Sequence, residues 1–219
     1  MENIEELKEA LCDVRRAHRI IYSYQARMLD LIKFISAKLN YTRIEGATKY
    51  FSNDIRKGRR EFAPLQIFEN MWAWDFIYPY LMEYYIGEKK EENGDWIALS
   101  IIQYSDTGYF EMEGASHTKI DSFASEENSA SKLLFIIEKK PQEVKNSVWD
   151  IKNIVMDKEY ASKNFKFSVV NKNGCRQGLY SFPIERFIDE KSSLQALQEF
   201  LDFCKNNDIV DWKNVLIRY

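Results

Sequence analysis

The sequence predicts an α+β fold in which a long amino-terminal helix packs on a mainly antiparallel sheet with flanking helices. Three observations support this prediction. Apolar residues recur at steps of three and four along the first forty positions, segments rich in aromatic and β-branched residues fill the middle, and a second helical pattern lies near the end. The 219 residues, 45% of them hydrophobic, suffice for one sizeable core. We expect a helix over residues 1–41 and a globular α+β domain over residues 42–219.

The first helix is predicted by an unbroken heptad seam with no Gly or Pro before Gly46. Its eleven positions are Ile4, Leu7, Leu11, Val14, His18, Ile21, Gln25, Met28, Ile32, Ile35 and Leu39. As one helix it would be roughly 50 Å long. Beyond Ile21 the apolar surface widens, so we expect the second half to dock on the core. The first half is an amphipathic stripe, and such a seam requires a partner surface.

The remaining elements follow from periodicity and turn residues. We expect a helix at 65–77, although its alternating aromatic residues would also suit a strand, and a last helix from Ser192, where Gln195 completes a capping box. Residues 114–131 are small and polar and predict a long mobile loop. The predicted strands are 80–86, 96–104, 109–113, 132–139 with a run buried on both faces, and a hairpin of 165–169 with 175–182.

Composition excludes several classes of protein. Thirty-one basic and thirty-four acidic residues give a net charge of -3, which argues against whole-surface attraction to nucleic acid or to an anionic membrane. No apolar run is long enough for a membrane helix, and the acidic start lacks the features of a secretory signal. Three cysteines far apart, Cys12, Cys175 and Cys204, are typical of a reducing compartment. We therefore expect a cytoplasmic protein.

One pattern at the end of a predicted strand is enzyme-like. Glu138 and Lys140, with Asp121 upstream, resemble the acidic and E-x-K elements of the restriction-endonuclease-like superfamily. The resemblance implies a metal-dependent phosphodiesterase in which these residues surround a divalent metal that activates water. That family usually has an apolar residue between Glu and Lys, whereas this chain has Lys139. The alternative is that the three residues form the solvated end of a hydrophobic strand.

A basic cluster offers a third hypothesis. Arg56, Lys57, Arg59 and Arg60 lie close together, as in loops that contact phosphate backbones, so the chain is a candidate nucleic-acid-binding accessory protein. The alternative is a solvated connector balanced by neighbouring acidic residues. Because the overall charge is negative, we favour the connector.

The leading hypothesis is a non-enzymatic interaction or assembly protein that forms a homo-oligomer or docks a helical partner. Its contacts would be Ile4, Leu7, Leu11, Val14, His18 and Ile21. The sequence has no Walker loop, GxGxxG, GxSxG or HExxH motif, and no cofactor or metal site is evident. His18 would either set the register of a helix interface or turn its ring to water. The flanks of the seam lack the charge pairs of a parallel coil, so antiparallel pairing and packing within the domain both remain open.

Overall fold

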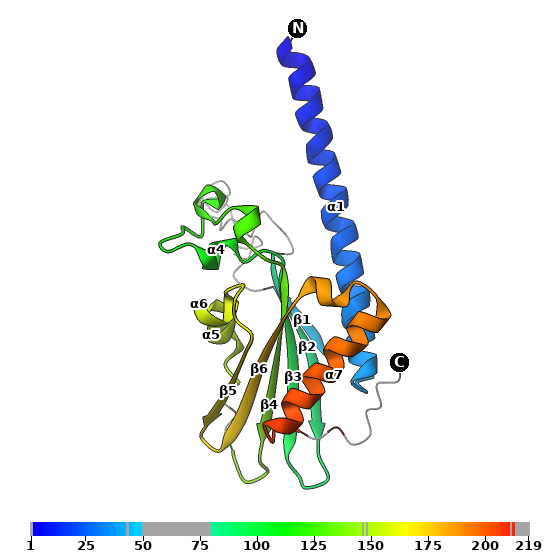
Figure 1. Cartoon of the computed structure of the whole chain (residues 1–219), viewed down its shortest axis with the longest axis vertical. Coiled ribbons are helices and arrows are strands. Elements are labelled where there is room, and N and C mark those ends of the chain that lie inside the picture. The colour runs from blue at the N-terminus through cyan, green and yellow to red at the C-terminus, as the bar shows by residue number, and fades with distance from the viewer. Residues whose placement is uncertain are drawn as a thin grey trace, which may run out of the picture.

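The computed structural model describes residues 2–42, 44–49, 80–145, 147, 149–210 and 212. Six antiparallel strands form one sheet in the order β1-β2-β3-β4-β6-β5. Figure 1 shows the sheet standing between two layers of helices. The strands are β1 (Gly46–Lys49), β2 (Leu81–Lys90), β3 (Trp96–Tyr104), β4 (Lys132–Lys140), β5 (Phe167–Lys172) and β6 (Cys175–Pro183).

The helices divide between the two faces of the sheet. On one face, α1 (Glu2–Lys38) and α7 (Glu190–Asn206) enclose the larger core, which includes Phe135 and Phe200. On the other face lies a smaller core around Tyr104, and it is covered by short helices. These are α4 (Gly108–Glu111), α5 (Ile151–Met156) and α6 (Lys158–Ala161), and 3-10 turns occur at Ile120–Ser122, Glu126–Asn128 and Ile184–Phe187. The predicted α+β class with a long first helix is confirmed.

β4 is the central strand of both cores. Leu133, Phe135 and Ile137 pack beneath α1 and α7, whereas Leu134 and Ile136 point to the opposite core. This alternation explains why the strand reads as a continuous apolar run. The turn Asn173–Gly174 between β5 and β6 adopts positive φ at both residues, as a tight hairpin requires.

Two sequence-based expectations were wrong in detail. Residues 109–113 are not a strand, because 108–111 form a single helical turn whose rings pack on Tyr104 and Phe123. The last helix is capped by Asp189, whose carboxylate accepts a hydrogen bond from the Ser192 amide at 2.7 Å, so the helix begins before Ser192. The predicted helix at 65–77 lies outside the described residues.

Candidate interaction surface on the amino-terminal helix

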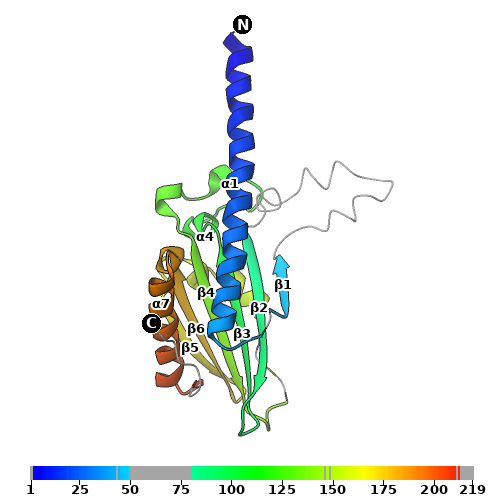
Figure 2. The same ribbon diagram turned by 90° about the vertical axis from the view of Figure 1, so that its right-hand side faces the viewer.

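The first half of α1 stands clear of the rest of the described molecule. Every residue from 4 to 20 is exposed, and Figures 1 and 2 show this part of α1 projecting beyond the end of the sheet. At 1.5 Å per residue these seventeen residues span about 25 Å. We call residues 4–20 the arm.

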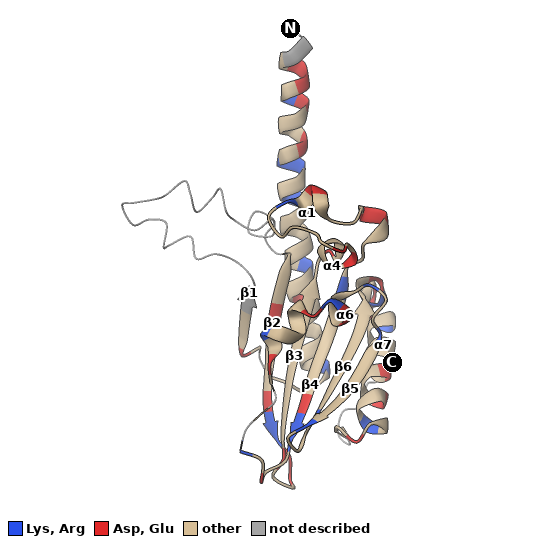
Figure 3. Ribbon diagram, turned by 90° about the vertical axis from the view of Figure 1, so that its left-hand side faces the viewer, with Lys and Arg blue, Asp and Glu red and all other residues tan. Residues whose placement is uncertain are grey.

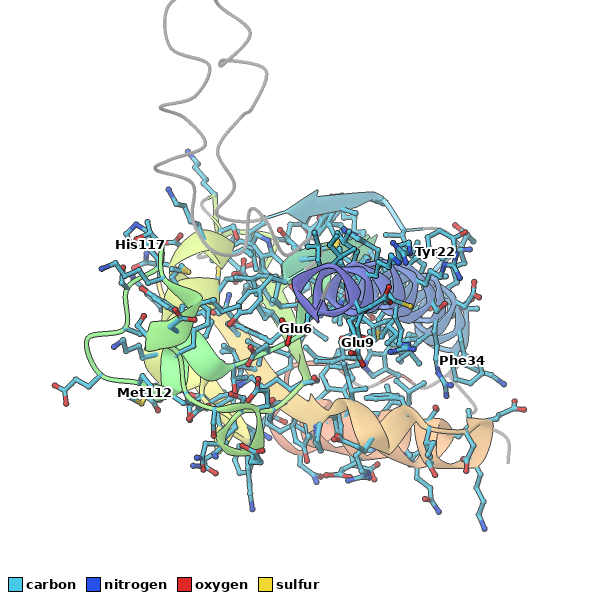
Figure 4. All side chains as sticks on the ribbon, turned by 90° about the horizontal axis from the view of Figure 1, so that it is seen from above. Glu6, Glu9, Tyr22, Phe34, Met112 and His117 are labelled. Carbon is cyan, nitrogen blue, oxygen red and sulfur yellow. The ribbon has the colours of Figure 1, made fainter. Side chains whose placement is uncertain are left out.

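The arm presents an apolar stripe to solvent. Four seam positions keep about half of their surface exposed: Ile4 (59%), Leu7 (58%), Leu11 (47%) and Val14 (52%). The seam faces one side of the helix. Tyr22 borders the seam, whereas Glu9 lies off it. In Figure 4, Glu9 points away from the side of the helix that Tyr22 occupies. Amphipathic helices in proteins owe most of their stability to packing of the apolar face, so an unpacked stripe of this length is a candidate interaction surface.

The second half of α1 shows what the same heptad pattern does when it has a partner. Met28, Ile32 and Ile35, with Leu39 directly after the helix, are at most 2% exposed, and all four belong to the core between α1, α7 and the sheet. One helix therefore carries one seam in two environments, buried at its carboxyl end and open at its amino end.

A closed ring of hydrogen bonds fixes α1 where it leaves the sheet. Gln25 Nε2 donates to the Tyr84 hydroxyl at 2.7 Å, and this hydroxyl donates to Gln103 Oε1 at 2.7 Å. Gln103 Nε2 then donates back to Gln25 Oε1 at 3.1 Å. Because each group in the ring is satisfied by another, the ring specifies one position of α1 on the sheet. The arm is thus held in a fixed direction at its base.

Charge is unevenly distributed along α1. Residues 2–13 contain five acidic residues and one lysine, whereas residues 14–29 contain four arginines and no acidic residue. Figure 3 shows the acidic residues gathered toward the amino terminus. Two exposed ion pairs lie within the arm, Glu5 with Lys8 at 2.6 Å and Asp13 with Arg16 at 2.5 Å. The arm therefore has an acidic outer part and a basic inner part.

The structure does not bring the three enzyme-like residues together. Asp121 is exposed on a 3-10 turn of the connection between β3 and β4, which joins β4 at Lys132. Glu138 lies six residues further along β4, about 20 Å at the rise of a strand. It is 2% exposed and accepts hydrogen bonds from Ser147 Oγ and, at 3.4 Å, from Gln177 Nε2. The Glu138 carboxylate is therefore buried and hydrogen-bonded, and it is not part of a solvated strand end.

Lys140 is likewise engaged locally, because its Nζ donates to the Val144 carbonyl at 3.1 Å. Over the described part of the chain, no group of three or more His, Cys, Asp or Glu side chains is placed to hold a metal ion. The geometry of a shared metal site at Asp121 and Glu138 is therefore missing. The basic cluster Arg56, Lys57, Arg59 and Arg60 lies outside the described residues.

Of the six predicted contact residues, five are exposed on the arm, including His18, and Ile21 at its base is half-buried. Sequence reasoning missed the partners of Gln25, because Tyr84 and Gln103 lie 59 and 78 residues away in the chain. A polar residue at a heptad position was the available signal.

None of the helices within the described ranges is long and apolar enough to cross a membrane. No curated protein and no solved structure matches this chain. The model of the PM0109 family matches residues 4–209, a range that takes in the arm, the whole sheet and α7. The chain therefore belongs to the PM0109 family.

Proposed function

We propose that this protein is an assembly protein whose two copies pair through their arms. The observation that carries the proposal is the projecting, half-exposed apolar stripe of Ile4, Leu7, Leu11 and Val14. Its continuation packs well wherever a partner surface is present, as Ile32 and Ile35 show on the sheet. A second helix with the same seam is the surface that fits knobs of this spacing.

The charge distribution favours a second copy lying antiparallel. In that orientation the acidic outer part of each arm lies beside the basic inner part of the other. A parallel pair would place acidic beside acidic and arginine beside arginine. Opposite charges on two neighbouring helices attract each other even when they are solvated, although each contact contributes little.

One antiparallel register brings every seam position of the arm into the interface. When the residue numbers of facing positions add to 25, Ile4 faces Ile21, Leu7 faces His18 and Leu11 faces Val14. Each of these facing pairs then combines an a position of one helix with a d position of the other, as in antiparallel coiled coils. His18 is the single polar group in these layers, and such a residue specifies register at some cost in stability.

The flanks of the seam are compatible with this arrangement. On one flank Ala10 and Ala17 face each other, and their small side chains allow close approach of the two backbones. On the other flank Lys8 faces Arg15 of the second copy, and Glu5, 2.6 Å from Lys8, compensates one of the two positive charges.

The test is the solution mass of the intact chain by sedimentation velocity across micromolar concentrations. We expect a concentration-dependent dimer that becomes monomeric in Leu11→Glu, because burying a leucine contributes roughly 1.5–3 kcal/mol, more than tenfold in Kd. The matched control is Ile20→Glu, which changes an arm residue that is 61% exposed and off the seam, and should remain dimeric. Circular dichroism should show unchanged folding in both variants.

A wild-type chain that stays monomeric at about 100 μM would overturn self-association, because a dimer with a micromolar Kd would be populated at that concentration. A dimer that persists in Leu11→Glu would show that another surface makes the contact.

A further inference from the structure

We propose that the end of the sheet farthest from the arm binds a phosphate group, free or carried by a small phosphate monoester. The site is a pocket of about 410 Å³ where β4, β5 and β6 meet the end of α7, and we call it the basic pocket. Its lining includes Lys139, Lys172, Arg176, Asp208 and the turn Asn173–Gly174. A volume of this size lies within the range of small-ligand sites.

Two cations in the pocket are held side by side by the sheet. Lys139 on β4 pairs directly with Arg176 on β6, and Asn171 on β5 is the next residue in the same row. Directly opposed side chains on antiparallel strands lie about 4.5–5.5 Å apart at Cβ, and like charges there repel. Lys172, the next residue of β5, alternates to the other face of the sheet and adds a more distant positive charge at the rim of the pocket. An anion that bridges these groups would relieve the repulsion.

The carboxylates nearby compensate the cations only in part. Asp95 lies 3.4 Å from Lys139, and Asp208 lies 4.0 Å from Arg176, at the limit of an ion pair. Asp208 is also 87% exposed, so its carboxylate is hydrated and weakly held. The lining itself contains three basic residues and this one carboxylate.

Arg176 retains unused hydrogen-bonding capacity. Its Nε is buried and has no hydrogen-bond partner among the described residues, whereas its side chain as a whole remains 34% exposed. A buried donor without a partner is unfavourable, but this nitrogen has no surface open to a ligand, so a phosphate would bind the exposed part of the guanidinium. The guanidinium fork matches two oxygens of a phosphate, for which Arg is better suited than Lys. Phosphate is therefore the ligand class that fits the geometry and the charge.

The charge of Asp208 makes the proposal directional. Its carboxylate stands against the same guanidinium that would receive the phosphate, so it competes with the ligand. Removing that charge should strengthen binding, whereas removing the charge of Arg176 or Lys172 should weaken it. A nonspecific attraction to the surface would not depend on which basic residue is changed.

The experiment is a calorimetric titration of the full chain at low ionic strength, with inorganic phosphate and with glycerol 3-phosphate in separate arms. We expect Arg176→Gln to weaken binding about tenfold or more, Lys172→Gln to weaken it less, and Asp208→Asn to tighten it. Tighter binding of the ester than of phosphate would identify a phosphate monoester as the ligand, and equal or weaker binding would identify the free anion. Lys172→Gln alters an exposed hairpin residue, so its effect does not depend on stability.

The control is Arg186→Gln, because Arg186 is a half-exposed arginine paired with Glu199 at 2.8 Å and lies outside the pocket lining. It should bind as the wild type does. Absence of binding at ~10 mM phosphate would overturn the proposal, because a site with a millimolar Kd would be mostly occupied at that concentration. So would an equal loss of affinity in Arg186→Gln and Arg176→Gln, which would indicate nonspecific ion binding.

Discussion

Lys132 is the most unusual side chain at the residue scale. It is 2% exposed at the start of β4, and its Nζ donates to the backbone carbonyls of Tyr160 at 2.5 Å and Ser162 at 2.6 Å. Burial lowers its pKa to about 7, and the nearby charge of Glu111 offsets only part of that effect. The lysine ties the end of α6 to the sheet at the cost of burying an ammonium group.

This environment predicts a pH-dependent stability. The pKa of Lys132 is about 7 in the folded chain and about 10.4 when unfolded, so the unfolded state binds more protons between those pH values. The free energy of unfolding should therefore rise with pH across this window, by up to about 1.4 kcal/mol per pH unit, and the rise should be absent below pH 7. Urea unfolding of the wild type and Lys132→Met at about pH 7, 8 and 9 measures how the free energy of unfolding changes with pH. These pH values lie in the window between the two pKa values.

Lys132→Met should lack this contribution, whereas Lys158→Met, which removes an exposed lysine of α6, should retain it. Equal slopes in the wild type and Lys132→Met would show that the buried ammonium does not titrate in this range.

Individual residues also show the limit of sequence reasoning. The sequence offers Glu138 either as a metal ligand or as part of a solvated strand end, whereas in the structure its carboxylate is buried and accepts hydrogen bonds from Ser147 and Gln177. Gln177 lies 39 residues away along the chain. Spacing within a short motif carries no information about such partners.

At the scale of elements, α1 allows a buried isoleucine and an exposed isoleucine to be compared within one helix. Ile35 is fully buried in the core, and Ile20, fifteen residues earlier in the same helix, is 61% exposed and off the seam. Ile35→Ala should lower the free energy of unfolding by about 2–5 kcal/mol, because it removes buried methyl groups and leaves a cavity.

Ile20→Ala should change the free energy of unfolding by less than about 0.5 kcal/mol, and alanine is the better helix former. Denaturant unfolding of the two variants gives both values. Similar losses from both substitutions would contradict the division of α1 into an anchored half and an exposed half.

Elements with strong local signals were predictable from sequence. The strand at 96–104 matches β3 residue for residue, and the Asn173–Gly174 turn joins β5 to β6 as expected. The turn at 108–111 was not, because its aromatic residues suit a strand equally well and only contacts such as Tyr104 with Phe110, 5.7 Å between ring centroids, determine the helical form. Tertiary packing decides short segments of this kind.

At the scale of the whole molecule, the order of the strands in the sheet could not be predicted from the sequence. The local turn predicts the hairpin β5–β6, but no local signal places β6 rather than β5 beside β4. The result positions the arm and the basic pocket at opposite ends of the sheet. Gln25, at the base of the arm, bonds to Gln103 near the end of β3, whereas the pocket adjoins Lys139 near the end of β4, which runs the other way.

Pairing through the arms would therefore leave both basic pockets open, and its orientation can be measured by crosslinking. In a Cys12→Ser background we would prepare Leu7→Cys and His18→Cys as separate chains, both altered at exposed positions. The proposed antiparallel register places Leu7 of one copy opposite His18 of the other, at a separation that a disulfide can span.

Mild oxidation of the two chains mixed should therefore yield a covalent dimer, and oxidation of either chain alone should yield little. A parallel pair would instead crosslink each chain when it is oxidised alone, since Leu7 then faces Leu7 and His18 faces His18, and mixing the chains would add nothing. The remaining cysteines, Cys175 and Cys204, are buried and contribute no background. Crosslinking of the single chains would refute the antiparallel orientation and leave self-association intact, because the sedimentation measurement tests that separately.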